Sequence, residues 1–419
     1  MILPGAGGRL RRAAGIKVFA CFALAYFMSF ALRSIGAVIA PELTRDFGLT
    51  NSELGALSSA YFLAFAAIQL PLGVWLDRYG ARRTHGLLLL LAAVGCAVFA
   101  LAAQAGTLWI GRALSGMGVA GALMSALKGY RFWFPVHRQQ QLAAFMLMAG
   151  SCGALATTVP ARLAMPAVGW RGLFWIAAAL FVLASLLILW LLPRDEERSA
   201  AGGQIDGAPL WGGYAEVFRS AYFWRFALVS MLSHAGFVSL QTLWAGPWLM
   251  QVDGLSAEAA AQVLLVFNVA LMGGFMVVGA LAPTIARRGW PMTTFTATGT
   301  ALLLTAELAI ALWPGGAGAW VLWPLLALVS TFFSMVQPHV SLSFPPALTG
   351  RAYTAYNLLL FVAMFGWQWL FGVGVDLWTA AGRAGADGFR ATMFSAIGVQ
   401  VTGLAVFLSW RAKPAPSPH

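Results

Sequence analysis

Charged residues are scarce in this sequence. Only 10% of its 419 residues are Asp, Glu, Lys or Arg, whereas 60% are hydrophobic. A typical soluble domain contains about 25% charged and about 45–50% apolar residues. A soluble fold has too little interior to hold this much apolar side chain, so the composition excludes an ordinary cytosolic enzyme and a disordered chain. It indicates a protein that lies in a lipid bilayer.

Cysteine is also rare. Cys21, Cys96 and Cys152 each lie in an apolar stretch, and none is near another in the sequence. Disulfide frameworks and metal clusters need paired or closely spaced ligands, so neither is expected. The sequence also lacks a Walker loop, a metalloprotease motif and paired catalytic carboxylates. We therefore expect no cofactor, no bound metal and no enzymatic activity.

Apolar stretches of membrane-spanning length are abundant. A helix needs about 20 mainly apolar residues to cross a hydrocarbon core of about 30 Å. No cleavable signal peptide is evident, because the first apolar stretch is too long and no small-residue cleavage site follows it. The sequence predicts twelve spans, at residues 17–40, 53–75, 84–104, 107–128, 142–165, 172–193, 223–247, 259–282, 291–313, 319–340, 352–376 and 390–411.

Basic residues set the orientation of these spans. With a cytoplasmic N-terminus, 19 of the 26 Lys and Arg residues fall on the cytoplasmic side, 5 on the other side and 2 inside spans. Short cytoplasmic loops of membrane proteins carry such an excess of positive charge. Both termini are therefore predicted to be cytoplasmic, and the net charge of +12 does not indicate a nucleic-acid partner.

One long connection divides the chain into two halves. It covers residues 194–222, contains the flexible stretch Ser199–Gly203, and ends in residues 211–219, which have the pattern of a short amphipathic helix on the inner membrane face. We therefore expect three regions: an N-terminal six-helix half at 1–193, a cytoplasmic linker at 194–222, and a C-terminal six-helix half at 223–419.

Weak sequence echoes relate the two halves. Gly73–Arg83, at the end of the second span, resembles Gly279–Gly289 at the end of the eighth, and Phe134-Pro135 recurs as Phe344-Pro345. Each echo alone is weak. Together with six spans on each side of the linker they support duplicated halves, a feature of alternating-access transporters whose substrate site lies near the midplane.

Two motifs carry a specific resemblance. Gly73-Val74-Trp75-Leu76-Asp77-Arg78-Tyr79-Gly80-Ala81-Arg82-Arg83 resembles the loop signature of the major facilitator superfamily, Gly-x-x-x-Asp-Arg-x-Gly-x-Arg-Arg. Arg112–Gly118 resembles its second signature, Arg-x-x-x-Gly-x-Gly. The resemblance implies an all-α membrane protein with twelve transmembrane helices in two pseudo-symmetric six-helix bundles. We further expect a multi-pass protein of the bacterial inner membrane that acts as a monomer.

The loop signature supplies the candidate gating residues. The resemblance implies that Asp77, beside the arginines of the loop, stabilises the outward-facing state and separates from its partners when the transporter opens inward. The alternative is a topology anchor without a gating role. Pro283 replaces this aspartate in the second half, so only the first loop can form an aspartate latch. The candidates are Gly73, Asp77, Arg78, Gly80, Arg82 and Arg83.

Arginines in the first and fourth spans suggest an anionic substrate. Tyr26, Phe30 and Arg33 share one face at i, i+4 and i+7, and Arg112 lies in the fourth span. The resemblance implies that spans one, four, seven and ten line a central cavity. Two cations there, without an acid in the same spans, would attract a carboxylate. Alternatively, Arg33 extends toward the membrane surface and Arg112 bonds backbone carbonyls.

Polar residues in later spans complete the candidate pathway. His234, Phe237, Gln241 and Trp244 form one helical stripe, and Ser330, Ser334, Gln337 and Ser341 form another. A mid-membrane histidine can carry a coupling proton or can simply satisfy helix contacts. Asn357 lies in span eleven. Glu307 is the one acid well inside a span; it is a proton-carrier candidate by default, although a packing role is favoured because the resemblance places span nine at the periphery.

The function expected from these features is transport. The leading hypothesis is a secondary active transporter that moves a small anionic or carboxylate-bearing organic solute, with protons as the coupling ion. The alternative is a proton-driven efflux pump for a drug or metabolite. Span five lacks the Gly-Pro-x-x-Gly-Gly motif of many drug–proton antiporters, which makes the efflux-pump alternative less favoured. A third hypothesis, a membrane sensor or enzyme on the same scaffold, would need an added soluble domain or catalytic cluster.

Overall fold

The protein is all-helical in the residues that the computed structural model describes, which are 12–192, 212–315 and 318–412. A few side chains inside helices, including that of Asp77, lie outside the described residues. The helices form two compact units. The first comprises Met1–Ile39 and Ala60–Asp206, and the second comprises Ala40–Ser59 and Gly207–His419. Most of the predicted linker lies outside the described residues.

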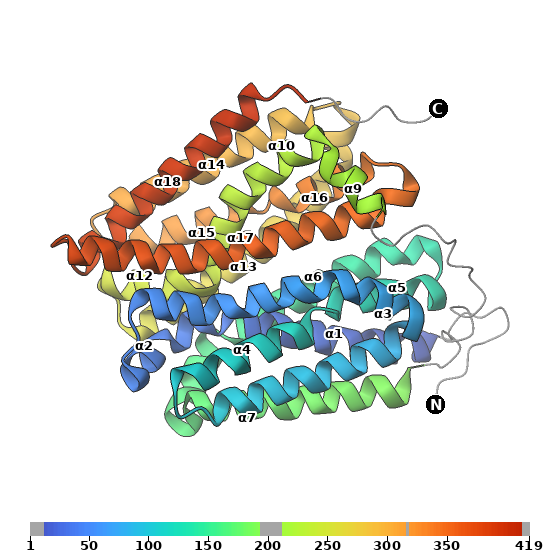
Figure 1. Ribbon diagram of the computed structural model, residues 1–419, viewed down its shortest axis with the longest axis horizontal. Helices are drawn as coiled ribbons and strands as arrows, with labels where there is room; N and C mark the ends of the chain where they lie inside the picture. Colours follow the sequence, from blue (N-terminus) through green and yellow to red (C-terminus); the bar gives the residue numbers. More distant parts are fainter. Residues whose placement is uncertain (1–11, 193–211, 316–317, 413–419) are drawn as a thin grey trace. The chain divides into compact units, whose positions relative to one another are not determined.

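The first unit contains the helices of the N-terminal part of the chain (Figure 1). Helix α3 begins in the second unit and continues into the first, with a kink at Gly80, where φ is 78° and ψ is 167°. Glycine occupies this region of backbone conformation almost alone, because it has no Cβ. The helices are α1 (Arg12–Ser34), α3 (Asn51–Ala100), α4 (Ala105–Val119), α5 (Ala122–Trp133), α6 (Val136–Ala156) and α7 (Val159–Leu191).

Small residues allow close helix packing in the first unit. A Cβ at Gly118 would lie 2.3 Å from the backbone nitrogen of Ala92, and one at Gly95 would lie 2.4 Å from that of Ser115. Backbones can approach this closely only where side chains are absent, as is common in membrane helix pairs. The small-residue stripe Gly111, Ser115 and Gly118 therefore packs α4 against α3.

The second unit contains α2 (Gly36–Phe47, mainly from Ala40) and the helices after the linker. Residues 212–219 form the short helix expected at the end of the linker, with Val217 buried and Glu216 exposed. The later helices are α9 (Gly212–Arg219), α10 (Ala221–Val229), α11 (Ala235–Ser239), α12 (Ala245–Gln251), α13 (Ala257–Arg287), α14 (Met292–Leu312), α15 (Ala319–Ser330), α16 (Phe333–Leu342), α17 (Pro346–Ala380) and α18 (Ala386–Ser409).

Ten helices among the described residues are long and apolar enough to cross a membrane. The predicted span 53–75 is not among them, and the fifth is represented by the shorter apolar helix Gln141–Ala156. The predicted fifth span covers most of α6 and of the part of α7 that precedes the kink at Gly169, with an interruption after Ala156; Pro160 lies in the first turn of α7, a position that proline favours. Helix α7 then continues past a kink at Gly169 into the predicted sixth span. The count of twelve spans stays a prediction.

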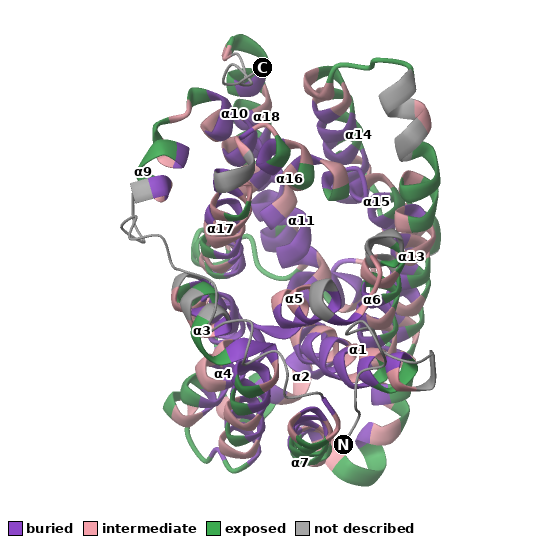
Figure 2. Ribbon diagram, turned by 90° about the vertical axis from the view of Figure 1, so that its right-hand side faces the viewer, coloured by how far each residue is buried: buried purple, intermediate pink, exposed green. Residues whose placement is uncertain are grey.

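Several helices carry exposed large apolar residues. Figure 2 colours parts of α7 and α13 as exposed. Trp190 on α7 is 76% exposed, and Met276 on α13 is 59% exposed. Exposing so many apolar side chains to water is unfavourable, whereas a lipid hydrocarbon core accommodates them. The arrangement fits helices that face lipid on one side and protein on the other.

Candidate functional site

One face of α1 carries an aromatic and cationic row. The Tyr26 and Phe30 rings lie 4.9 Å apart in an edge contact, and the guanidinium carbon of Arg33 lies 4.6 Å from the Phe30 ring centre. The Phe65 ring of α3 lies 5.9 Å from the same carbon. The predicted shared face of these three α1 residues is therefore confirmed by direct contact. Arg33 is half-buried, so its charge lies at the edge of the packed interior.

Arg112 on α4 is held by α1. Its side chain is 2% exposed, and one guanidinium nitrogen donates to the backbone oxygen of Leu32 at 2.9 Å. The rings of Phe99 and Phe174 lie 5.4 and 5.7 Å from its guanidinium carbon. This is the backbone-bonded arrangement that the sequence left as the alternative. The Arg112 charge is directed into helix packing, while Arg33 contacts a different aromatic pair.

The fourth span is broken near its middle. Helix α4 ends at Val119 and α5 begins at Ala122, so the carbonyl of Ala120 is available to a side chain. The amide nitrogen of Gln69, from α3, lies 3.5 Å from that oxygen, and Gln69 is 2% exposed. Gln69 was not among the predicted site residues. A lone glutamine in an apolar stretch is the signal that could have identified it.

The seventh span contains two π-helical segments, at Ser230–His234 and Leu240–Trp244. A π turn takes more residues than an α turn, so the spacing of the predicted stripe is altered. Phe237 stacks on Phe267 of α13, whereas Trp244 contacts Phe371 of α17. The residues of the predicted stripe therefore contact more than one neighbouring helix, and the spacing behind that prediction assumed a continuous α-helix.

His234 and Gln241, the two candidates on this span, each lie in a π segment. The His234 ring stacks on Phe333 of α16, with ring centres 4.6 Å apart and an angle of 7° between the planes. The Gln241 amide nitrogen lies 3.4 Å from Asn268 Oδ1 on α13. Both side chains are half-buried, so each is in contact with a neighbouring helix and is partly accessible.

Helix α17 braces the seventh span at both π segments. The Trp367 indole donates to the backbone oxygen of Met231 at 2.9 Å, and the Gln368 amide donates to Thr242 Oγ1 at 2.7 Å. Trp244 in turn donates to the backbone oxygen of Gln368 at 3.0 Å. These bonds satisfy polar atoms where the helical pattern changes, and they link both π segments to α17.

The tenth span is also interrupted, between Ser330 at the end of α15 and Phe333 at the start of α16. Ser334 is exposed and donates to the backbone oxygen of Thr331 at 2.7 Å. The Gln337 amide donates to the backbone oxygen of Tyr353 on α17 at 3.3 Å. Asn357 lies half-buried on α17, one residue after the buried Tyr356.

Broken or π-bulged helices thus occur in spans four, seven and ten, which are three of the four spans expected to line the pathway. Interrupted transmembrane helices free backbone groups for substrates and ions near the membrane midplane. The sequence did not indicate these interruptions. The candidate functional residues are therefore Arg33 and the span-four break in the first unit, and the interrupted spans seven and ten in the second unit.

The loop signature is described only in part. The side chain of Asp77 lies outside the described residues. Gly80 makes the left-handed turn, while Gly73 has open space around the position of a Cβ. Arg82 Nε donates to the backbone oxygen of Leu189 on α7 at 2.9 Å. Arg78 lies over the Tyr79 ring at 5.4 Å, and Arg83 is exposed. The hydrogen bond from Arg82 links the end of the turn to α7.

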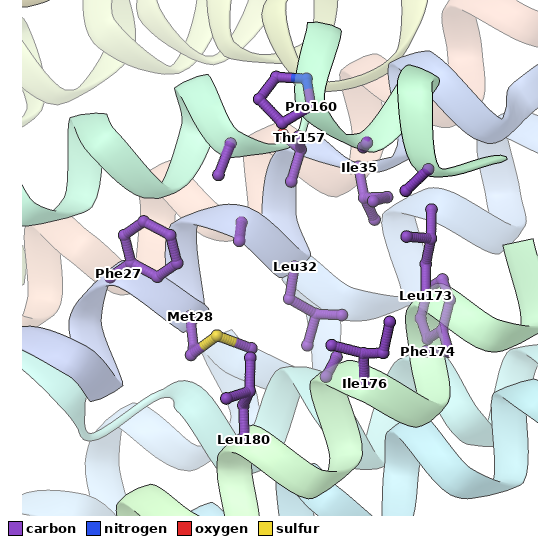
Figure 3. A pocket seen from close by; sticks show the side chains of 15 residues that line it. Phe27, Met28, Leu32, Ile35, Thr157, Pro160, Leu173, Phe174, Ile176 and Leu180 are labelled. Atoms are coloured by element: carbon purple, nitrogen blue, oxygen red, sulfur yellow. The ribbon is translucent and has the colours of Figure 1, made fainter. Parts of the chain in front are cut away.

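A cavity of about 220 Å³ in the first unit lies on another face of α1. Figure 3 shows Phe27, Met28 and Leu32 of α1, and Ile35 just after it, opposite side chains of α7. Its one hydroxyl, that of Thr157, already donates to the backbone oxygen of Ala154. The lining offers nothing that would recognise a charged solute. No group of three metal-ligating side chains occurs among the residues for which the structure gives positions.

Comparisons with known proteins agree with this arrangement. The profile of the Major Facilitator Superfamily matches residues 22–367. A hexuronate transporter of Escherichia coli K12 is 24% identical over 268 residues, covering 60% of this chain and 62% of that protein. A probable sulfoacetate transporter of Cupriavidus necator is 28% identical over 176 residues, covering 42% of this chain and 41% of the relative. The matches thus span less than two thirds of these relatives.

Solved structures share the fold. A bacterial homologue of the human lysosomal transporter Spinster, in an inward-facing and unoccupied conformation, superposes with a TM-score of 0.72 at 20% sequence identity. The match covers 95% of this chain and 97% of that structure. At this level of identity the likeness concerns the fold alone.

Proposed function

This chain belongs to the major facilitator superfamily, and we propose that it is a proton-coupled transporter of a small organic anion. It is a multi-pass membrane protein of a transporter family. We further propose that it works by alternating access in a bacterial inner membrane, with both termini in the cytoplasm. The relatives named above are a hexuronate transporter and a probable sulfoacetate transporter, and both solutes are anions at neutral pH.

Arg33 is the observation that carries the anion proposal. It is a half-buried cation on a span that contains no acid, and it stands on an aromatic face formed by Phe30 and Phe65. A guanidinium held by aromatic rings keeps a defined orientation and can present its N–H groups to a carboxylate or sulfonate. Arg112 is less suited to this task, because its guanidinium is buried and already donates to Leu32.

Counterflow in proteoliposomes tests the proposal. Proteoliposomes that contain the purified protein are loaded with unlabelled D-galacturonate or sulfoacetate. Uptake of the labelled compound is then measured with and without a pH gradient. We expect uptake of at least one of these labelled anions. The absence of uptake for these and other organic acids under both conditions would refute the anion claim.

A matched pair of arginine variants locates the site. Losing a charge-assisted hydrogen bond costs about 1.5–3 kcal/mol, so Arg33→Gln should raise the KM for the transported anion about 10- to 100-fold. Arg33→Lys should retain part of the affinity. Arg45→Gln is the control, because Arg45 is an exposed side chain paired with Asp46. Equal KM values for Arg33→Gln and Arg45→Gln would exclude Arg33 from the site.

A further inference from the structure

A carboxyl group and an amide are paired inside the second unit. Glu307 on α14 is 0% exposed, and Gln400 on α18 is 2% exposed. The Gln400 amide nitrogen donates to Glu307 Oε2 at 2.7 Å. Helices α14 and α18 pack along each other, as Figure 1 shows. The pair is therefore part of a helix interface that water does not reach in this structure.

The oxygens of this pair are only half satisfied. Glu307 Oε1 and Gln400 Oε1 are both buried and have no hydrogen-bond partner. An ionised carboxylate and an amide oxygen are both acceptors, so neither can satisfy the other. A proton on Glu307 Oε1 would provide the donor that the Gln400 oxygen lacks. The neutral acid also avoids the cost of an unbalanced buried charge.

No counter-ion faces Glu307 from the helices packed against α14. Helix α15 has no titratable residue, and on α16 the one such residue, His339, shares a 2.7 Å hydrogen bond with the Tyr222 hydroxyl. Helix α18 carries Asp387 and Arg390 in its first turns. Arg390 donates to the backbone oxygen of Trp313 at 2.8 Å.

The helices that pack against α18 also use their charges elsewhere. Arg225 on α10 donates to the backbone oxygen of Phe407, and His234 in the first π segment stacks on Phe333. On α17, Asp376 accepts hydrogen bonds from Asn51 and Ser52, and Arg351 lies beside Gly213 of α9. The remaining titratable groups on α10 and α17 are the phenols of Tyr222, Tyr353 and Tyr356. None of them supplies a positive charge to the Glu307–Gln400 pair.

Two threonines extend the polar row along α14. Thr296, Thr300 and Glu307 are spaced by four and seven residues, so they lie on one face of the helix. Both threonines are 0% exposed, and both hydroxyl oxygens lack a hydrogen-bond partner. Buried polar atoms without partners are rare in native proteins and call for an explanation. A row of them leading from the start of α14 to a carboxyl group fits transient entry of water or a proton.

We propose that Glu307 and Gln400 form a proton-binding site, in which Glu307 is a neutral acid that loses its proton along the Thr300 face of α14 during transport. The coupling step rests on the proposed transport function, whereas the neutral acid does not. The proposal assigns a chemical role to the acid for which the sequence alone favoured packing.

Infrared spectroscopy tests the neutral acid without any substrate. The full-length protein in lipid vesicles should show the carbonyl band of a protonated carboxyl group at neutral pH. Glu307→Gln should remove this band. Gln400→Leu should shift it, because the hydrogen bond from the Gln400 amide to Glu307 is lost. Glu216→Gln, an exposed acid on α9, is the matched control and should leave the band in place. Absence of the band in the wild type, or its persistence in Glu307→Gln, would overturn the proposal.

Transport measurements test the coupling step, with D-galacturonate and sulfoacetate as probes. Glu307→Gln should keep counterflow but reduce accumulation driven by an inward proton gradient at least tenfold. Thr300→Val, which is nearly isosteric, should slow that accumulation with less effect on counterflow. If the wild type moves neither probe, the transport proposal fails and the infrared result still decides the neutral acid. Full gradient-driven accumulation by Glu307→Gln would refute the coupling role.

Discussion

Arg112 shows how one charged side chain can be structural even within a family motif. Its guanidinium donates to Leu32 and lies between two phenylalanine rings, so replacing it should affect folding before it affects substrate. Losing this buried charged hydrogen bond in Arg112→Lys should lower stability by about 1–3 kcal/mol, because an ammonium cannot reproduce the planar contacts. Thermal unfolding in detergent measures this, and the KM of the folded protein should stay unchanged.

Arg171 provides the matched control for this substitution. It also donates to a backbone oxygen, that of Ala102 at 3.0 Å, and lies 4.2 Å over the Trp170 ring, but it is exposed. Exposed interactions of this kind are each worth about 1 kcal/mol or less, so Arg171→Lys should have a small effect. If Arg112→Lys unfolds like the wild type but binds the anion more weakly, Arg112 contacts substrate instead.

Asp253 gives stability a pH dependence. It lies in the connection between α12 and α13, where burial raises the pKa of its carboxyl group from 3.8 to about 6, against the opposing effects of Trp323 and Arg390. A raised folded-state pKa means that the neutral acid is favoured in the folded protein. Its contribution is therefore complete below about pH 3.8 and is lost as the pH rises through about 6.

The variant Asp253→Asn isolates this contribution. Asparagine stays neutral, so the variant should gain stability relative to the wild type between about pH 4 and pH 7. Melting temperatures of both proteins across this range provide the measurement. A constant difference between the two curves would show that Asp253 does not titrate in this interval.

At the scale of the element, α3 begins against α17 within the second unit. The Asp376 carboxylate accepts hydrogen bonds from the backbone nitrogens of Asn51 and Ser52, at 3.2 and 2.7 Å, and from the Asn51 side chain at 2.9 Å. An acid at a helix N-terminus satisfies free N–H groups and interacts favourably with the helix dipole. Here the cap comes from a residue more than 300 positions away in the sequence.

Close glycine contact makes this junction sensitive to a single methyl group. A Cβ at Gly372 would lie 2.2 Å from the backbone oxygen of Asn51, so Gly372→Ala must push α3 and α17 apart. Overpacking of this kind costs about 1–3 kcal/mol. Gly366 lies on the same helix with open space around its Cβ position, so Gly366→Ala should be neutral or slightly stabilising. Equal melting temperatures for both variants would contradict the close contact.

The two motifs predicted the family, while hydropathy predicted most spans and helical spacing predicted the α1 face, because these depend on patterns along one helix. The mid-span breaks were not predictable in this way. The break at Ala120 has Gln69 from α3 beside its carbonyl, and the π segments depend on Trp367 and Gln368 of α17. These partners are distant in sequence, so single-helix periodicity cannot identify them. The pairing of Glu307 with Gln400 was hidden for the same reason.

At the scale of the whole molecule, the number of spans decides the side of each loop. The predicted spans number twelve, whereas ten helices among the described residues meet the length and hydropathy criteria. Both numbers are even, so a reporter at either terminus cannot distinguish them. The loop at Leu101–Gln104 can, because one fewer span precedes it when 53–75 does not cross. With a cytoplasmic N-terminus, twelve spans place this loop outside and ten place it inside.

Single cysteines can decide between these topologies. Cys21, Cys96 and Cys152 are first replaced, and cysteine is then introduced at the exposed Gln104 or Gln141. Because spans 53–75 and 84–104 return the chain to the outer side, we expect a membrane-impermeant maleimide to label Gln104→Cys in intact cells. Gln141→Cys should react only after permeabilisation, which also controls for expression of both variants. The reverse pattern would show that 53–75 does not cross, and would move the loop signature away from the inner surface where a gate needs it.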